Sequence, residues 1–220
     1  MDQSHTFPWR KWSTFEMTDF QAWWNTVNND LGNQDLQVEA KDWQFLYWRS
    51  KTPAQAVHHI QNYLETKKIA DKYDKWDLRF LEQARVISTW SKDPSTKCGA
   101  VIINPQNQKV VGVGYNGFPR GMSDAQELYD DREIKYSRVI HCEMNAVLDA
   151  GHAAVGATLY TWPFMSCDRC TVHVIQAGIK RCVAPIIPAD AYSRWGPTVE
   201  KSRRYLKEAN VLLDELDLGL

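Results

Sequence analysis

The chain has 220 residues, 44% of them hydrophobic, and a formal net charge of -1 at pH 7. That length allows one well-packed domain with an extension, and it excludes two large independent domains. The near-zero charge argues against a polyanionic partner such as DNA or RNA, because nucleic-acid-binding domains usually carry a strong excess of basic residues. We therefore expect a small-molecule substrate and no nucleic-acid partner.

The cysteines and the apolar pattern indicate the compartment. Five cysteines are present, two of them in a Cys-x-x-Cys pair at Cys167 and Cys170, which favours metal or redox chemistry over a disulfide framework. The chain starts without the apolar segment of a signal peptide, and no run of about 18 apolar residues occurs in it. We expect a cytoplasmic protein with no membrane partner.

Residues 1–70 are rich in tryptophan and are interpreted as an extension. Pro53 predicts the start of a helix, because a proline at the first helical position loses no needed hydrogen bond. Val57, Ile60 and Leu64 follow at helical spacing. We expect the tryptophans to pack the extension onto the core or onto a neighbouring subunit. They are Trp9, Trp12, Trp23, Trp24, Trp43 and Trp48.

From residue 73 the pattern becomes that of a compact domain. Trp76, Phe80, Ala84 and Ile87 recur every three or four residues, which predicts an amphipathic helix that ends near residue 90. Apolar runs at 100–103 and 110–113, separated by a polar turn, predict a β-hairpin. Residues 116–138 combine glycine, proline and charge, which predicts a long loop with a short helix.

The rest of the chain alternates between helix and strand patterns. Helices are predicted over 141–150, 167–176 and 198–209, and strands at 158–160, 182–183 and 211–213. This order predicts an α/β protein whose mixed sheet carries helices on both faces.

Three candidate metal ligands and one acidic residue lie at the starts of two predicted helices. His141 and Glu143 begin one predicted helix, and Cys167 and Cys170 begin another. Helical side chains tilt toward the N-terminus of the helix, so residues in the first turns of two helices can converge. Both helix dipoles would then lower the pKa of the thiols. The three ligands His141, Cys167 and Cys170 leave the fourth position of a zinc ion open for water, which is typical of catalytic sites.

Glu143 is interpreted as the proton carrier and not as a fourth ligand. Attack of water on an aromatic amidine carbon needs a base for the water and an acid for the ring nitrogen and the leaving amine. H-x-E followed by P-C-x-x-C is the signature of zinc nucleobase deaminases. Ser166 replaces that proline here, and it is expected to cap the helix of the cysteines.

From Ser91 onward the chain resembles the deoxycytidylate deaminase family, and order and spacing agree throughout. The resemblance implies a cytidine deaminase-like fold over residues 71–220. That fold is a three-layer α/β/α sandwich around a mixed five-stranded sheet, to which residues 1–70 add a mostly helical extension. The matching stretches are Ser91–Pro94 with Gly99–Ile102, Gly114–Gly121, His141–Ala146 and the pair Cys167 and Cys170.

The same resemblance implies a substrate and its contacts. The zinc enzyme would convert dCMP to dUMP and ammonia and so supply thymidylate synthesis. Lys92 would lie near the 5′-phosphate, Asn116 near the deoxyribose, and the backbone N–H of Cys142 near the pyrimidine carbonyl.

The resemblance also implies regulation at a second nucleotide site. That site would lie at a subunit interface of a homohexamer, where dCTP with Mg²⁺ activates and dTTP inhibits. Its residues would be Gly114, Tyr115, Asn116 and Gly117. Independently of the resemblance, glycines let a backbone approach phosphate oxygens closely.

Two alternative functions stay open. A deaminase that edits polynucleotides would share the zinc motifs but would need a basic binding surface. A catalytically inactive regulatory module would bind nucleotides and keep zinc for structure, and such a module has no use for an acid at Glu143.

Overall fold

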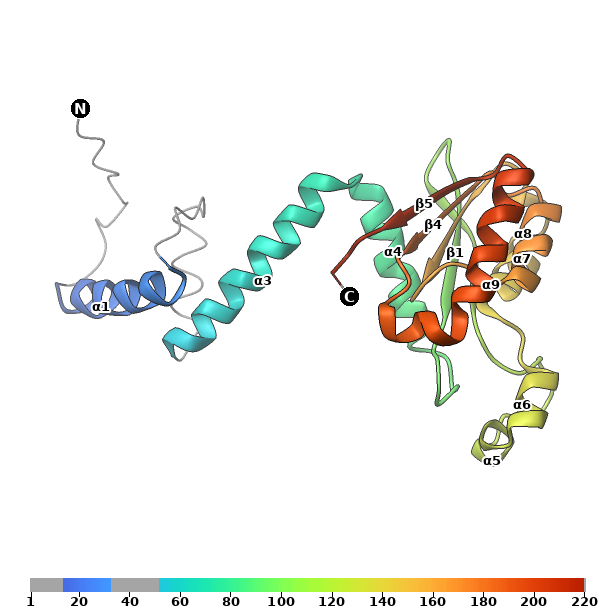
Figure 1. Ribbon diagram of the computed structural model, residues 1–220, viewed down its shortest axis with the longest axis horizontal. Helices are drawn as coiled ribbons and strands as arrows, with labels where there is room; N and C mark the ends of the chain where they lie inside the picture. Colours follow the sequence, from blue (N-terminus) through green and yellow to red (C-terminus); the bar gives the residue numbers. More distant parts are fainter. Residues whose placement is uncertain (1–13, 33–51, 220) are drawn as a thin grey trace. The chain divides into compact units, whose positions relative to one another are not determined.

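The structure, a computed structural model, describes residues 14–32 and 52–219 (Figure 1). Contacts within the chain divide it into two compact units, with the boundary between Lys72 and Tyr73. In the described ranges, no helix combines the length and the apolar character needed to cross a membrane.

In the N-terminal unit, the helices α1 (Thr14–Asp30) and α3 (Pro53–Lys72) pack together through apolar side chains. Trp23 and Val27 of α1 contact the same cluster as Ala56 and Ile60 of α3, and Val27 and Ile60 are fully buried. The predicted helix start at Pro53 is confirmed. Of the tryptophans in the extension, four lie outside the described residues: Trp9, Trp12, Trp43 and Trp48.

The C-terminal unit contains one mixed sheet of five strands in the order β2-β1-β3-β4-β5. β1 runs antiparallel to both β2 and β3, whereas β3, β4 and β5 run parallel to one another. The expected mixed five-stranded sheet is therefore confirmed. The predicted hairpin consists of β1 and β2, and β2 is an edge strand of the sheet. The strands are β1 (Gly99–Asn104), β2 (Lys109–Tyr115), β3 (Thr158–Trp162), β4 (Arg181–Pro185) and β5 (Leu212–Leu216).

Helices cover both faces of this sheet, which confirms the three-layer sandwich (Figure 1). Successive side chains of a strand point to opposite faces. In β1, Val101 and Ile103 accordingly join the core with α4 (Lys75–Ser88), whereas Ala100 and Ile102 join the core on the other face. That second core contains residues of α7 (Cys142–Ala150), α8 (Asp168–Gln176) and α9 (Ala189–Glu208).

The helix α7 packs very closely on the edge strand β2, because β2 presents glycines to it. A Cβ atom on Gly114 would lie 2.2 Å from the carbonyl oxygen of Cys142, and one on Gly112 would lie 2.5 Å from the carbonyl oxygen of Ala146. Two side chains of α7 also bond to the outer edge of β2. Asn145 Nδ2 donates to the carbonyl of Tyr115 (2.7 Å), and Asp149 Oδ2 accepts from the N–H of Val113 (2.9 Å). The position of α7 is thereby fixed by β2.

The segment predicted as a long loop contains two short helices, α5 (Gln126–Asp130) and α6 (Arg132–Arg138). The Asp131 carboxylate caps α6 by accepting a hydrogen bond from the N–H of Ile134 (3.0 Å). The rings of Phe118 and Tyr129 stack with their centroids 4.2 Å apart, which holds α5 against the chain that leaves β2. A short 3-10 helix, η1 (Gly151–Ala154), follows α7.

The helix α9 is longer than predicted, because it begins at Ala189 and not near residue 198. Gly196 and Pro197 lie inside this helix, although glycine and proline both disfavour a helix interior. Pro197 removes the N–H that would bond to the carbonyl of Ser193. Ser193 and Pro197 are both exposed, so water can satisfy that carbonyl.

The last strand also extends beyond its prediction of residues 211–213 and reaches Leu216. Asp214 and Glu215 interrupt its apolar pattern, but both carboxylates are ion-paired. Arg181 Nε lies 2.7 Å from Asp214, and Arg203 Nε lies 2.7 Å from Glu215. Charged side chains suit a strand at the edge of a sheet, where one side faces solvent.

Candidate active site

Three candidate metal ligands converge at the N-terminal ends of α7 and α8. His141 is the N-cap of α7, Cys167 is the N-cap of α8, and Cys170 lies in the first turn of α8. The prediction that Ser166 caps α8 is wrong, because the helix begins one residue later, and its N-cap makes no side-chain hydrogen bond. In the described part of the chain, these three residues form the one candidate metal group, with their ligand atoms all within 4.8 Å of one another.

The spacing of the three ligand atoms fits a zinc ion. Nδ1 of His141 lies 3.5 Å from Sγ of Cys167 and 3.3 Å from Sγ of Cys170. A tetrahedral zinc ion at about 2.3 Å from sulfur and about 2.0 Å from nitrogen would place such atoms roughly 3.6 Å apart. One imidazole and two thiols are also the donor types that zinc prefers. The residues present therefore fit a three-ligand zinc site with one open position.

Hydrogen bonds among the ligands stabilise a thiolate. The bond from Cys170 lowers the pKa of Cys167 to about 4, although burial opposes this. The bond with Cys167 raises the pKa of His141 to about 9, and the bond with Cys167 likewise raises the pKa of Cys170. The negative charge of the Cys167 thiolate is thus stabilised by hydrogen bonds from Cys170 and His141. A bound metal cation would replace the protons of these two donors.

Glu143 lies beside the ligands as a buried carboxylate and is not a member of the ligand group. It comes from the first turn of α7, two residues after His141. Its Oε2 accepts a hydrogen bond from Sγ of Cys142 (3.2 Å), and burial raises the pKa of that thiol well above its ordinary value. Cys142 therefore stays protonated and donates to the carboxylate.

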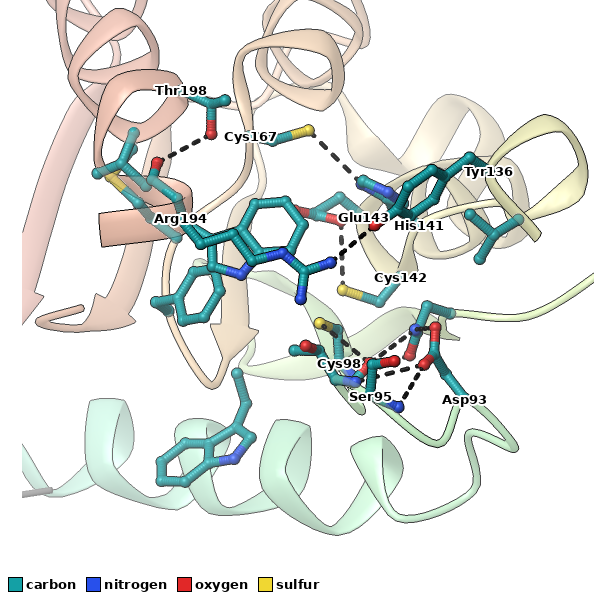
Figure 2. A pocket seen from close by; sticks show the side chains of 18 of the residues that line it. Asp93, Ser95, Cys98, Tyr136, His141, Cys142, Glu143, Cys167, Arg194 and Thr198 are labelled. Atoms are coloured by element: carbon teal, nitrogen blue, oxygen red, sulfur yellow. Dashed lines mark hydrogen bonds between the residues drawn. The ribbon is translucent and has the colours of Figure 1, made fainter. Parts of the chain in front are cut away.

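His141, Cys167 and Glu143 line a pocket of about 700 Å³, counted out to its opening (Figure 2). The aromatic residues Trp162, Phe164 and Trp195 form an apolar part of its wall, and the rings of Phe164 and Trp195 lie 6.0 Å apart. An apolar pocket with a few convergent polar groups is the usual form of a small-molecule site.

The structure brings two of the three predicted substrate contacts to this pocket. Asn116 and Cys142 line it, whereas Lys92 does not. Lys92 is exposed, and its Nζ lies 2.6 Å from the carboxylate of Asp124. Asn116 is buried, with Oδ1 accepting from the N–H of Cys98 (2.8 Å) and Nδ2 donating to the carbonyl of Thr96 (2.9 Å). It therefore orders the loop that forms one side of the pocket.

The predicted effector residues lie at the end of β2 and just after it. Gly114 faces α7, so its lack of a side chain is required by helix packing. Tyr115 is 41% exposed and contacts Trp90 edge to face, with 6.0 Å between ring centroids. Gly117 bonds through its backbone to Ile140.

The lining residues that sequence reasoning missed include Lys135, Tyr136, Arg194 and Trp195. Lys135 and Tyr136 belong to α6, inside the segment predicted as mainly loop. Arg194 and Trp195 belong to the part of α9 that precedes Pro197. The only signal for the second pair is an arginine next to a tryptophan, and that signal does not indicate a site by itself.

Comparison with known proteins identifies the family. Residues 74–185, half of the chain, match the cytidine and deoxycytidylate deaminase zinc-binding region. An "uncharacterized deaminase in luxG 3'region" from Aliivibrio fischeri is 38% identical over 146 residues, which covers 66% of this chain and 97% of the relative. A deoxycytidylate deaminase from Mus musculus is 38% identical over 122 residues, which covers 53% of this chain and 67% of the relative.

A solved structure shares the fold. It is the dCMP deaminase of the cyanophage S-TIM5 in complex with dCMP and dUMP, with a TM-score of 0.50 and 22% identity over 63% of this chain and 94% of the phage protein. The sequence match contains the three candidate ligands His141, Cys167 and Cys170, and it also contains Glu143. The chain belongs to the family of zinc-dependent cytidine and deoxycytidylate deaminases.

Proposed function

We propose that this protein deaminates dCMP to dUMP and ammonia by hydrolysis. The observation that supports this most strongly is the convergence of His141, Cys167 and Cys170 beside the buried Glu143, at a pocket that His141, Cys167 and Glu143 line. Relatives at this level of similarity carry the name deoxycytidylate deaminase, and the fold is shared with a phage enzyme solved with dCMP and dUMP. A monophosphate is therefore preferred to a free nucleoside as the substrate.

The residues of the chain would divide the work of the reaction. Zinc held by His141, Cys167 and Cys170 would supply a water of lowered pKa, about 7, as the nucleophile at neutral pH. Glu143 would accept one proton from the attacking water and deliver it to ring nitrogen N3. It would then pass the second proton to the amino group. Carbon C4 gains the water oxygen, its bond to nitrogen breaks, and dCMP and water become dUMP and ammonia.

The pocket walls would orient the pyrimidine. The base is flat and apolar on its faces, so it would lie against Phe164 and Trp195 with its amino edge toward Glu143. The N–H of Cys142, in the first turn of α7, would meet the pyrimidine carbonyl. Asn116 would lie near the deoxyribose, with one Oδ1 lone pair still available beside its bond to Cys98.

Regulation by nucleoside triphosphates is part of the proposal. dCTP with Mg²⁺ would activate and dTTP would inhibit at a site that includes Tyr115 and Gly117, in a cytoplasmic homohexamer. The exposed ring of Tyr115 supports this, since a large aromatic side chain on the surface can contact a nucleotide base. Gly114 and Asn116 would act indirectly there, because their side-chain positions face α7 and the loop at the pocket.

Release of ammonia from dCMP, deoxycytidine and dCTP, measured side by side on zinc-loaded protein, tests the proposed function. We expect dCMP to be the preferred substrate by kcat/KM. Preference for deoxycytidine would make the chain a nucleoside deaminase. Tight retention on single-stranded DNA at physiological salt, with turnover of cytidines within it, would favour the polynucleotide-editing alternative.

A further inference from the structure

We propose that Arg194, supported by Tyr136 and Arg132, binds the 5′-phosphate of the substrate and so selects nucleotides over nucleosides. This inference rests on the proposed function, because it names the group that recognises the anionic end of dCMP. It places the phosphate between α6 and α9. Lys92, the residue expected from the family resemblance, lies outside the pocket lining.

Arg194 is held in place over the pocket by two contacts. Its guanidinium lies on the ring of Trp195, 4.9 Å from the ring centroid, and its Nη2 donates to the hydroxyl of Tyr136 (2.8 Å). Figure 2 shows the guanidinium directed toward Tyr136. Guanidinium has five N–H donors in a planar fork, and this arrangement leaves most of them for a two-point contact with phosphate oxygens.

A second guanidinium shares the same hydroxyl. Arg132 Nε donates to Tyr136 (3.1 Å), and its guanidinium lies 5.5 Å from the centroid of that ring. Two cations therefore meet at one neutral oxygen, and the hydrogen bond from Arg132 contributes most to lowering the pKa of Tyr136. This local excess of positive charge attracts an anion to the mouth of the pocket.

Arg194 and Arg132 lack the ion pairs that some other arginines of the described chain make. Arg181 pairs with Asp77 of α4 and Asp214 of β5, and Arg203 pairs with Glu200 of α9 and Glu215 of β5. Within residues 14–32 and 52–219, by comparison, Arg194 and Arg132 have no carboxylate within ion-pair distance. A phosphate would supply the negative charge that these two side chains lack.

Two lysines considered for the phosphate, Lys135 and Lys92, are each ion-paired with a carboxylate. Lys135 is buried, and its Nζ lies 2.7 Å from Asp93 and 3.0 Å from the hydroxyl of Ser95. Lys92 is paired with Asp124. Arg194 is therefore the lining cation best placed to meet a phosphate. It lies on exposed surface, whereas Glu143 is buried. A nucleotide that enters base first would leave its strongly hydrated phosphate at this exposed end.

The test compares dCMP and deoxycytidine as substrates of zinc-loaded wild type, Arg194→Gln and Arg194→Lys, with single-turnover conditions for slow reactions. Loss of a charged two-point contact should lower kcat/KM for dCMP by about 10- to 100-fold in Arg194→Gln and leave deoxycytidine turnover within about twofold. Arg194→Lys should recover part of the loss, because it keeps the charge but not the fork. Arg204→Gln, an exposed arginine on the same helix, is the matched control and should change neither rate.

A second arm measures binding of inorganic phosphate by calorimetry, which does not depend on turnover. Wild type and Arg204→Gln should bind phosphate, and Arg194→Gln should bind it at least about tenfold more weakly. Equal losses on dCMP and deoxycytidine, or unchanged phosphate binding in Arg194→Gln, would overturn the inference. A loss of kcat/KM for dCMP alone in Lys92→Gln, with no such loss in Arg194→Gln, would show that Lys92 binds the phosphate instead. Wild type that binds phosphate through Arg194 but does not deaminate dCMP would contradict only the proposed function.

Discussion

At the scale of single residues, Glu143 and the three zinc ligands have different tasks, and their surroundings differ accordingly. The ligands share one negative charge among hydrogen-bonded thiols and an imidazole. Glu143 instead bonds to the protonated thiol of Cys142, outside the ligand group. A carboxylate in that position can exchange protons with a substrate, because it does not have to dissociate from a metal ion first.

Glu143→Gln should therefore retain about one zinc ion per chain and lose about 10²- to 10⁴-fold in kcat, because an amide neither accepts nor donates the transferred proton. Metal analysis and ammonia release on the same preparation measure both quantities. Cys167→Ala is the comparison variant, and it should lose metal and activity together. Loss of zinc in Glu143→Gln would mean that Glu143 is a ligand, and normal zinc in Cys167→Ala would contradict the proposed site.

The zinc ligands could be predicted from the sequence because they are defined by local features. His141, Cys167 and Cys170 stand at predicted helix starts, and short spacing within each motif fixes how they can converge. Arg194 and Tyr136 could not be predicted in this way. They meet at the pocket because side chains of α6 and α9 reach each other there, and nothing in either local pattern specifies that contact.

At the scale of elements, the close packing of α7 on β2 positions His141 and Glu143. Gly114 is the tightest point of that packing, with the carbonyl of Cys142 at 2.2 Å and the N–H nitrogen of Ala146 at 2.4 Å from a Cβ built on it. Both atoms belong to the backbone of α7, so they cannot move aside independently.

Gly114→Ala should destabilise the protein by about 3 kcal/mol, because α7 must shift to relieve the overlap. Zinc content should fall with it, since the shift moves His141. Gly117→Ala is the matched control in the same segment, because the nearest atom to its Cβ would be 3.6 Å away. It should cost less than about 1 kcal/mol. Denaturant unfolding and metal analysis measure the difference, and equal stability of the two variants would show that β2 does not fix α7.

The periodicity of the sequence predicted which helices and strands are present, but it did not predict how long they are. The core-facing patterns predicted α4, the hairpin of β1 and β2, and the alternation from α7 to β5. The predicted ends of elements were wrong where tertiary contacts override the local preference of a residue. Pro197 is tolerated because it faces solvent, and Asp214 and Glu215 are tolerated because an edge strand brings them to Arg181 and Arg203.

At the scale of the whole molecule, regulation requires two states that bind effectors differently. A tenfold shift in apparent affinity for dCMP needs about 1.4 kcal/mol of preference between states. One or two hydrogen bonds near Tyr115 could supply that difference. The same proposal predicts a sigmoidal saturation curve for dCMP and a homohexamer in solution.

Tyr115→Ala should abolish the effects of dTTP and dCTP and retain most activity at saturating dCMP, because the ring lies on the surface at the end of β2. Steady-state kinetics with and without each effector, together with mass measurement in solution, test this. Linear competition between dTTP and dCMP in both proteins would show that dTTP enters the active site itself, and the enzyme would then be unregulated.

The central claim is that this pocket adds water to the pyrimidine of dCMP and releases its amino group. The most direct measurement is mass spectrometry of the product formed by the zinc-loaded enzyme from dCMP in heavy-oxygen water. The account predicts dUMP that carries one heavy oxygen from the solvent, formed in equal amount with ammonia, and almost no product from Glu143→Gln. Unchanged dCMP in the wild-type reaction, or dUMP without solvent oxygen, would contradict the account.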